Sequence, residues 1–170
     1  MALASPAVGN LLEPAWLGVA RKYVGVKEVP GKATAPAIAR WLVALGAWWS
    51  DDETPWCGVA CAAVFRECGI AVPKDYFRAK AWATWGTPLE TPAVGCVVVF
   101  SRDGGGHVGI VVGKTQDGRL MVWGGNQGDQ VSIIPFDTVK RPPLAFRWPP
   151  GIPFTPSRLN LPVYASSAAS

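Results

Sequence analysis

The sequence predicts an α+β domain in which helices come first and an antiparallel sheet follows. In the first half of the chain, apolar residues recur at spacings of three and four, which is typical of helices that bury one face. After Pro92 the pattern changes to short β-branched runs separated by turns rich in Gly and Asp. Helices followed by such a meander favour segregated α and β layers.

The composition is that of one globular domain. The chain has 170 residues, of which 49% are hydrophobic and 16% are charged, and these values argue against intrinsic disorder. The net charge of +4 favours anionic surfaces such as cell-wall polymers. The basic residues are scattered rather than clustered, so we expect no binding of nucleic acid. We expect the protein to be a monomer.

Three segments are predicted from the local composition. Residues 1–13 form a mildly apolar N-terminal arm, residues 14–148 form the folded domain, and residues 149–170 form a Pro- and Ser-rich tail. No apolar run is long enough to cross a bilayer, and the N-terminus lacks the pattern of a signal peptide. We therefore expect neither stable membrane insertion nor an export signal.

The predicted elements are bounded by residues that start or stop them. Gly25, Gly46 and Gly69 stand after three helical patterns, and Pro36 and Pro55 stand near the start of two. The sheet is expected to have about five strands. The predicted helices cover residues 14–24, 36–45, 55–68 and 77–85, and the predicted strands cover residues 95–100, 107–113, 119–125, 130–134 and 144–148.

The four cysteines do not form a recognisable metal site. There is no CxxC pair and only one histidine in the chain, which argues against zinc. We see no acidic cluster of the kind that binds calcium, so we expect no metal and no cofactor. Cys61, Cys68 and Cys96 are interpreted as reduced, buried apolar residues.

Cys57 is the candidate nucleophile. It lies in the first turn of the predicted third helix, where unpaired N–H groups and the helix dipole stabilise a thiolate. The same N–H groups could stabilise the oxyanion that forms when an amide is attacked.

His107 is the candidate base, because it is the only histidine. It begins a predicted strand after three glycines, and we expect its ring to project at a sheet edge rather than to be buried. Asn126 ends the next strand, and antiparallel pairing would place it near His107, where it could orient the ring. Gln127 is a weaker candidate for that role and Asp129 a weaker one still. The order Cys, His, Asn is that of papain-like hydrolases.

Three blocks of the sequence resemble a known family. The stretches DDETPWCGVA, GGGHVGIVVG and VWGGNQGDQVSI are similar to the CHAP and NlpC type of papain-like cell-wall hydrolases, especially a compact group found in bacteriophage endolysins. The resemblance runs from about Trp16 to Trp148. It implies a papain-like fold and a cysteine peptidase or amidase whose partner is bacterial peptidoglycan.

The resemblance also implies roles for individual residues. By position it gives Cys57 as the nucleophile, His107 as the base and Asn126 as the third catalytic residue. The substrate-binding residues that we expect are Trp56, which adjoins the nucleophile, Gln127, and two residues at positions typical of the group, Asp52 and Glu28.

Several alternatives remain open at this stage. The amide bond could lie within the stem or cross-link peptide, which we favour, or between the glycan lactyl group and L-alanine. The chain could be an endolysin held in the host bacterial cytoplasm until a separate pore releases it to the periplasm and cell wall, or an antibacterial effector. A wall-binding module without activity is the non-enzymatic alternative. Glu28, Asp51, Asp52 and Glu53 are numerous enough to supply the carboxylate pair of a glycosidase, but nothing in their spacing favours that interpretation.

Overall fold

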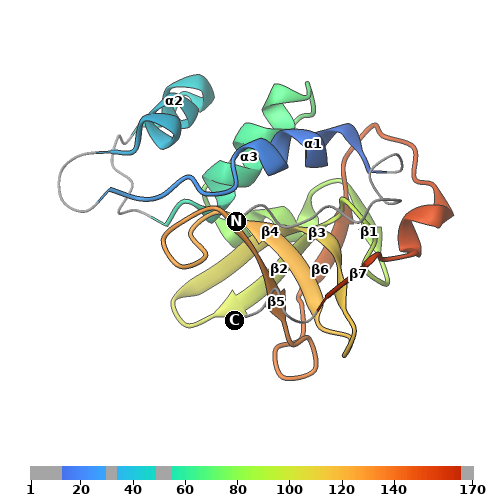
Figure 1. Ribbon diagram of the computed structural model, residues 1–170. Coiled ribbons are helices and arrows are strands. Elements are labelled where there is room, and N and C mark those ends of the chain that lie inside the picture. Colours follow the sequence, from blue (N-terminus) through green and yellow to red (C-terminus); the bar gives the residue numbers. More distant parts are fainter. Residues whose placement is uncertain (1–12, 30–33, 49–54, 166–170) are drawn as a thin grey trace.

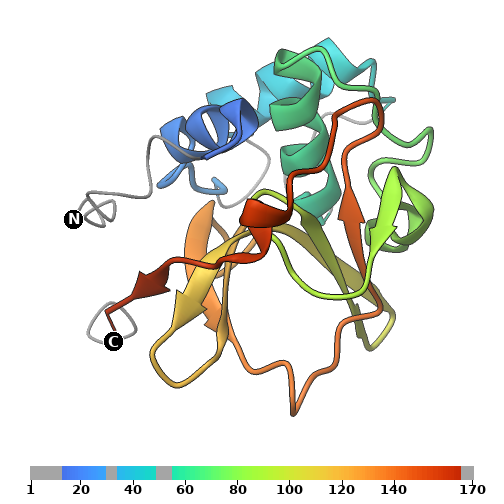
Figure 2. The same cartoon turned by 90° about the vertical axis from the view of Figure 1, so that its right-hand side faces the viewer.

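Three α-helices lie on one side of a mainly antiparallel β-sheet (Figures 1 and 2). The computed structural model describes residues 13–29, 34–48 and 55–165. The helical elements are α1 (Ala15–Lys22), α2 (Pro36–Leu45), α3 (Cys57–Glu67) and the 3₁₀ helices η2 (Ala79–Thr84) and η3 (Pro156–Leu159).

The helices follow from local sequence signals and from burial. α2 begins at a proline, whose fixed φ suits a first helical position, and it ends at Gly46 in the left-handed conformation. Its buried residues are Ile38, Trp41 and Leu42, which form one face. α3 differs because its residues 57–65 are buried on every side. A helix of small and apolar residues is therefore placed at the centre of the fold.

The described residues form a seven-stranded sheet in the order β1-β6-β2-β3-β4-β5, and β7 pairs with β3 in parallel. The other strand pairs are antiparallel. The strands are β1 (Thr87–Leu89), β2 (Val97–Arg102), β3 (Gly105–Thr115), β4 (Leu120–Gly124), β5 (Ser132–Phe136), β6 (Ala145–Trp148) and β7 (Val163–Tyr164).

The predicted fold class is confirmed: N-terminal helices pack on an antiparallel sheet. The sheet exceeds the expected number of about five strands by two short ones, β1 and β7, which are too short to carry a β pattern. The helix expected over residues 77–85 is a 3₁₀ helix, η2.

Part of the predicted C-terminal tail packs on the domain (Figure 2). The indole N–H of Trp148 donates to the carbonyl of Ile152 over 2.9 Å. Further on, the ring of Tyr164 is buried, and its hydroxyl lies 2.9 Å from Nη2 of Arg21 on α1. The segment up to residue 165 is therefore attached to both layers of the fold.

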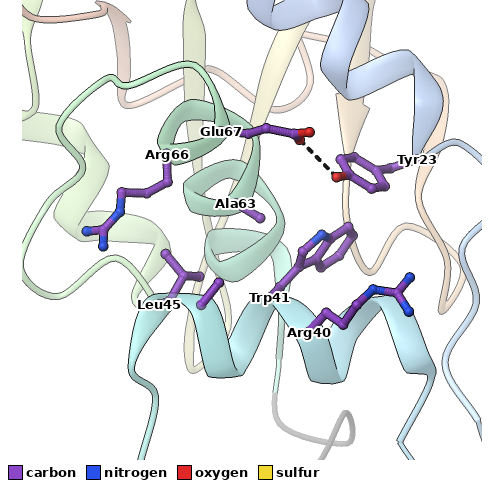
Figure 3. A pocket seen from close by; sticks show the side chains of 8 residues that line it. Tyr23, Arg40, Trp41, Leu45, Ala63, Arg66 and Glu67 are labelled. Carbon is purple, nitrogen blue, oxygen red and sulfur yellow. Dashed lines mark hydrogen bonds between the residues drawn. The ribbon is translucent and has the colours of Figure 1, made fainter.

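A hollow of about 450 Å³ lies between the three helices (Figure 3). Trp41 points into the space between α2 and α3, and its ring meets that of Tyr23 edge to face with centroids 5.0 Å apart. The hydroxyl of Tyr23 donates to Glu67 at the end of α3 over 2.8 Å. These contacts connect α1 and α2 to the helix that carries Cys57.

The helices in the described part of the chain are all too short or too polar to span a lipid bilayer.

We predict opposite effects of two glycine substitutions in helices. At Gly58 in α3 a Cβ would overlap the carbonyl oxygen of Tyr76, so Gly58→Ala should lower the free energy of unfolding by about 1–3 kcal/mol. At the exposed Gly18 in α1 a Cβ meets nothing, so Gly18→Ala should raise it by about 0.5–1 kcal/mol. Urea denaturation measures both. Equal effects of the two substitutions would contradict the packing of α3 against residues 76–77.

Candidate active site

Cys57 is the first residue of α3 and is 4% exposed. The N–H groups of the first turn of a helix have no partner within the helix, and those of Cys57 and Gly58 reach the Cys57 thiol. The helix packs against β3 near Val108: Sγ of Cys61, one turn further along, lies 3.9 Å from the Val108 carbonyl oxygen. The thiol of Cys57 is thus held between a helix start and the strand that carries His107.

The pKa of the Cys57 thiol is raised above its usual value by burial. Hydrogen bonds from the backbone of Val108 and Gly58 act in the opposite direction, because they stabilise the thiolate. The positive charge of Arg102 acts in the same direction as these hydrogen bonds. The thiol is therefore mainly protonated at rest, while donors for a negative charge are already in place.

His107 lies in β3 and is 4% exposed, so the expectation of a ring projecting at a sheet edge is wrong. β3 is an interior strand between β2 and β4, and α3 covers it. Nε2 of His107 lies 2.9 Å from Oε1 of Gln127, whose side chain is also buried.

The surroundings of Gln127 determine which nitrogen of His107 carries the proton. The Gln127 amide nitrogen donates to the carbonyl oxygens of Ser132 over 2.9 Å and of Val122 over 3.3 Å. Because an amide nitrogen only donates, its oxygen must face His107, and Nε2 of His107 must be the N–H donor. Nδ1 is then the unprotonated nitrogen, which is the one that can accept a proton.

The structure places Gln127, rather than Asn126, against the histidine. In the β3–β4 register Ile110 is opposite Trp123, and counting three residues along each strand would put Asn126 opposite His107. β4 ends at Gly124, however, and Asn126 has a φ of 57°, in the left-handed region that Asn tolerates. The chain turns there, so the side chain that reaches His107 is that of Gln127. We therefore propose Gln127, in place of Asn126, as the residue that orients the histidine.

Two glycines allow this turn to approach the site. A Cβ on Gly124 would overlap Oε1 of Gln127 and lie 3.2 Å from Nε2 of His107. A Cβ on Gly125 would lie 2.6 Å from the Cβ of Ala60 and 2.9 Å from the Trp56 ring. The end of β4 therefore contacts both the histidine pair and the first turn of α3, and neither contact leaves room for a side chain.

Sequence reasoning missed the aromatic support of His107. Phe136 in β5 stacks on the imidazole with centroids 5.7 Å apart, and Phe100 stacks on Phe136 at 4.8 Å. The Arg141 guanidinium lies over both phenylalanine rings. Burial lowers the pKa of His107 below its usual value, the Gln127 contact opposes this, and Arg102 and Arg141 lower it further. The imidazole is thus neutral and available as a base.

A cleft of about 650 Å³ opens at Cys57. One wall comes from residues 77–80 at the start of η2, and the other from the β2–β3 turn at residues 102–106. The hollow between the helices in Figure 3 has no cysteine or histidine in its lining. The cleft at Cys57 is therefore the candidate active site.

The remaining predicted site residues lie elsewhere. Trp56 is 1% exposed and packs near Trp41 with centroids 6.4 Å apart, so the structure does not bring its ring to the cleft. Glu28 is half-buried, and its backbone N–H donates to the Asp129 carbonyl over 2.9 Å, next to the turn that carries Gln127. Asp52 lies outside the described residues.

The other thiols and acids form no second centre in the part of the chain that is described. Burial raises the pKa of Cys96 to about 12, and it raises that of Cys61 well above the usual value. Both behave as apolar core residues. Among residues 13–29, 34–48 and 55–165, no three His, Cys, Asp or Glu side chains are grouped as metal ligands would be.

A thiol at a helix start that packs against the strand of a buried histidine with a fixed tautomer is the arrangement of a papain-like cysteine hydrolase. Residues 49–126 match the family model of the CHAP domain. The match includes Cys57 and His107 and ends one residue before Gln127. A CHAP domain implies an amidase or peptidase that acts on peptidoglycan and uses a cysteine. A comparison with curated proteins gave no match.

We predict that Gln127, and not Asn126, determines the tautomer of His107. Because His107 is the only histidine, ¹⁵N NMR of the imidazole reports this site alone. The protein should show the Nε2–H tautomer and a pKa below 6.5, because burial disfavours the cation. Gln127→Leu should give a mixture of tautomers, whereas Asn126→Gly, which suits the left-handed backbone, should not. A tautomer that changes only in Asn126→Gly would restore Asn126 to the third role.

Proposed function

We propose that the protein hydrolyses an amide bond in the peptide part of peptidoglycan, with Cys57 as nucleophile, His107 as base and Gln127 as the residue that orients His107. The observation that carries this proposal is the hydrogen bond between Nε2 of His107 and Oε1 of Gln127. It leaves Nδ1 of His107 free to accept a proton. His107 lies in β3, the strand whose Val108 contacts the Cys57 thiol. The CHAP match supports the choice of substrate.

The mechanism follows from these positions. Nδ1 of His107 takes the proton of the Cys57 thiol as Sγ attacks the carbonyl carbon of the substrate. The negative charge that forms on the carbonyl oxygen is stabilised by N–H groups of the first turn of α3. The imidazolium then protonates the leaving amine, the C–N bond breaks and a thioester remains on Cys57. Water, deprotonated by His107, hydrolyses the thioester and restores the thiol.

We propose that the bond lies within the stem or cross-link peptide. The amide between the glycan lactyl group and L-alanine would use the same chemistry, so the choice depends on which chain of the substrate fills the cleft. Mass spectrometry of the fragments released from purified peptidoglycan identifies the new amine and the new carboxylate, and thereby the bond.

We further propose that the biological role is that of a bacteriophage endolysin, which reaches the cell wall through a separate membrane pore. The support is the resemblance of the three blocks around Cys57, His107 and Asn126 to phage lysis enzymes. An antibacterial effector would use the same site with another delivery route. Lysis of cells on expression only when a pore-forming protein is co-expressed supports the endolysin role, and lysis without it counts against that role.

We predict that Cys57→Ala lowers the release of soluble fragments from purified peptidoglycan by about 10³-fold or more. The physical reason is that no other sulfur is positioned at the start of α3. The matched control is Cys61→Ala, which removes a buried thiol one turn further along the same helix. It should keep most of the activity.

Circular dichroism should show the same folded spectrum for both cysteine variants. Fragment release by Cys57→Ala at the rate of the unmodified protein would refute the proposal. Sedimentation with cell-wall material without any release by the unmodified protein would indicate a binding module instead.

We predict a bell-shaped pH dependence with an unusually wide plateau. Protonated His107 cannot accept the thiol proton, and because burial and the two arginines lower its pKa, the acid limb should lie below pH 6.5. The alkaline limb reports loss of the proton that the pair transfers to the leaving amine. Because burial raises the Cys57 pKa, this limb should lie above pH 9. Measurement of kcat/KM on a soluble muropeptide tests both limbs, and a plateau confined between pH 6.5 and 9 would contradict the account.

A further inference from the structure

Positive charge lines the cleft at Cys57. Three cationic side chains border it, Arg78, Lys80 and Arg102, and the acidic side chain in the described lining is that of Asp103. The three cations come from both walls of the cleft. Arg78 and Lys80 lie at the start of η2, and Arg102 is the last residue of β2. A group bound between the walls would therefore be exposed to positive charge from two sides.

These cations are not neutralised by carboxylates in the part of the structure that is described. The three ion pairs found there join Arg21 to Glu13, Lys22 to Glu67 and Arg119 to Asp117, all away from the cleft. Arg78, Lys80 and Arg102 are exposed. Cations gathered around a cleft without partners raise the local concentration of an anionic ligand.

Packing holds the cations close to the catalytic residues. The guanidinium of Arg78 lies over the ring of Phe77 at 5.6 Å. The stem of Lys80 lies against Gly106, where a Cβ would be 3.2 Å from Cγ of the lysine, and the next residue is His107. The field of Arg102 reaches both catalytic groups, because it lowers the pKa of Cys57 and that of His107. A ligand bound by these side chains would thus lie beside the scissile bond.

We propose that Arg78, Lys80 and Arg102 bind a free carboxylate of the peptide substrate next to the bond that is cut. This inference rests on the proposed function and specifies its substrate class. Guanidinium groups pair with carboxylates through two parallel hydrogen bonds, and a carboxamide lacks the charge and one of the acceptors. Stem peptides that carry a γ-linked acidic residue with a free α-carboxylate are therefore the preferred substrates. The same peptides with that carboxylate amidated are poor ones.

The test uses two muropeptide preparations that are identical except at the γ-linked D-glutamate, which carries a carboxylate in one and a carboxamide in the other. For the unmodified protein we expect kcat/KM to be about 10-fold higher for the carboxylate form, which is the size of effect that one hydrogen bond between charged groups typically contributes. Added salt should reduce this ratio, because it screens exposed charges.

The variants Arg78→Gln, Lys80→Gln and Arg102→Gln identify the side chains responsible. Each should lower kcat/KM for the carboxylate form more than for the carboxamide form, and the triple variant should bring the ratio close to one. The comparison within one variant cancels any change in the pKa of Cys57 or His107. Arg40→Gln is the matched control, because Arg40 is exposed and lies at the hollow between the helices instead. It should leave the ratio unchanged.

The outcomes separate the two proposals. A ratio near one in the unmodified protein, with both forms cleaved, overturns the carboxylate site and leaves the proposed function intact. A high ratio that persists in the triple variant also overturns it. If neither form is cleaved while the protein is folded, the proposed function fails and this inference fails with it.

Discussion

The hydrogen bond between His107 and Gln127 determines what the site can do. A histidine base needs one nitrogen protonated and the other available, and a buried neutral imidazole takes the tautomer that its partner imposes. Here the partner is itself oriented, because the Gln127 amide nitrogen donates to carbonyl oxygens of Val122 and Ser132 at β4 and β5. The backbone carbonyl groups of the sheet thereby orient the Gln127 amide, and this orientation sets which nitrogen of His107 carries the proton. If the amide were reversed, Nε2 would become the acceptor and Nδ1 would hold the proton.

Close packing around small residues makes this arrangement possible. Gly124 leaves the space in which His107 and Gln127 meet, and Gly125 lets the end of β4 reach the first turn of α3. On the other side of the helix, Gly58 accommodates the carbonyl of Tyr76 at the entrance to η2. The start of α3, which carries Cys57, is therefore held by close contacts with the end of β4 and with the backbone at residue 76.

Much of this arrangement could be predicted from the sequence. Periodicity and the flanking Gly and Pro residues predicted α2 with its observed bounds and the start of α3 to within a few residues. Chemistry singled out Cys57 and His107 as candidates, because a helix start favours a thiolate and the chain offers a single histidine, and the structure places them at the start of α3 and in β3. Antiparallel pairing of two successive strands was also predicted, and it led to Asn126, which in the observed register would fall opposite His107 if both strands continued.

The parts that could not be predicted depend on tertiary contacts. The left-handed turn at Asn126 has no unique signature in Gly-Gly-Asn-Gln, and only the carbonyl groups of β4 and β5 select Gln127. Trp56 was expected in the cleft because it adjoins Cys57, but successive residues at a helix start face different directions, and its ring is buried. The joining of residues 163–164 to β3 depends on a two-residue parallel pairing, which no local pattern encodes.

The most direct test of the central claim is the rate at which iodoacetamide alkylates Cys57 at neutral pH, measured by mass spectrometry of the peptide that contains it. If His107 accepts the thiol proton, His107→Gln should slow alkylation of Cys57 by about 10-fold or more, because burial raises the pKa of the thiol and the chain has no second histidine. Alkylation of the exposed cysteine of a small thiol peptide added to the same solution should be unaffected. An unchanged rate at Cys57 in the variant would show that the imidazole does not serve the sulfur, and the account of the site would be wrong.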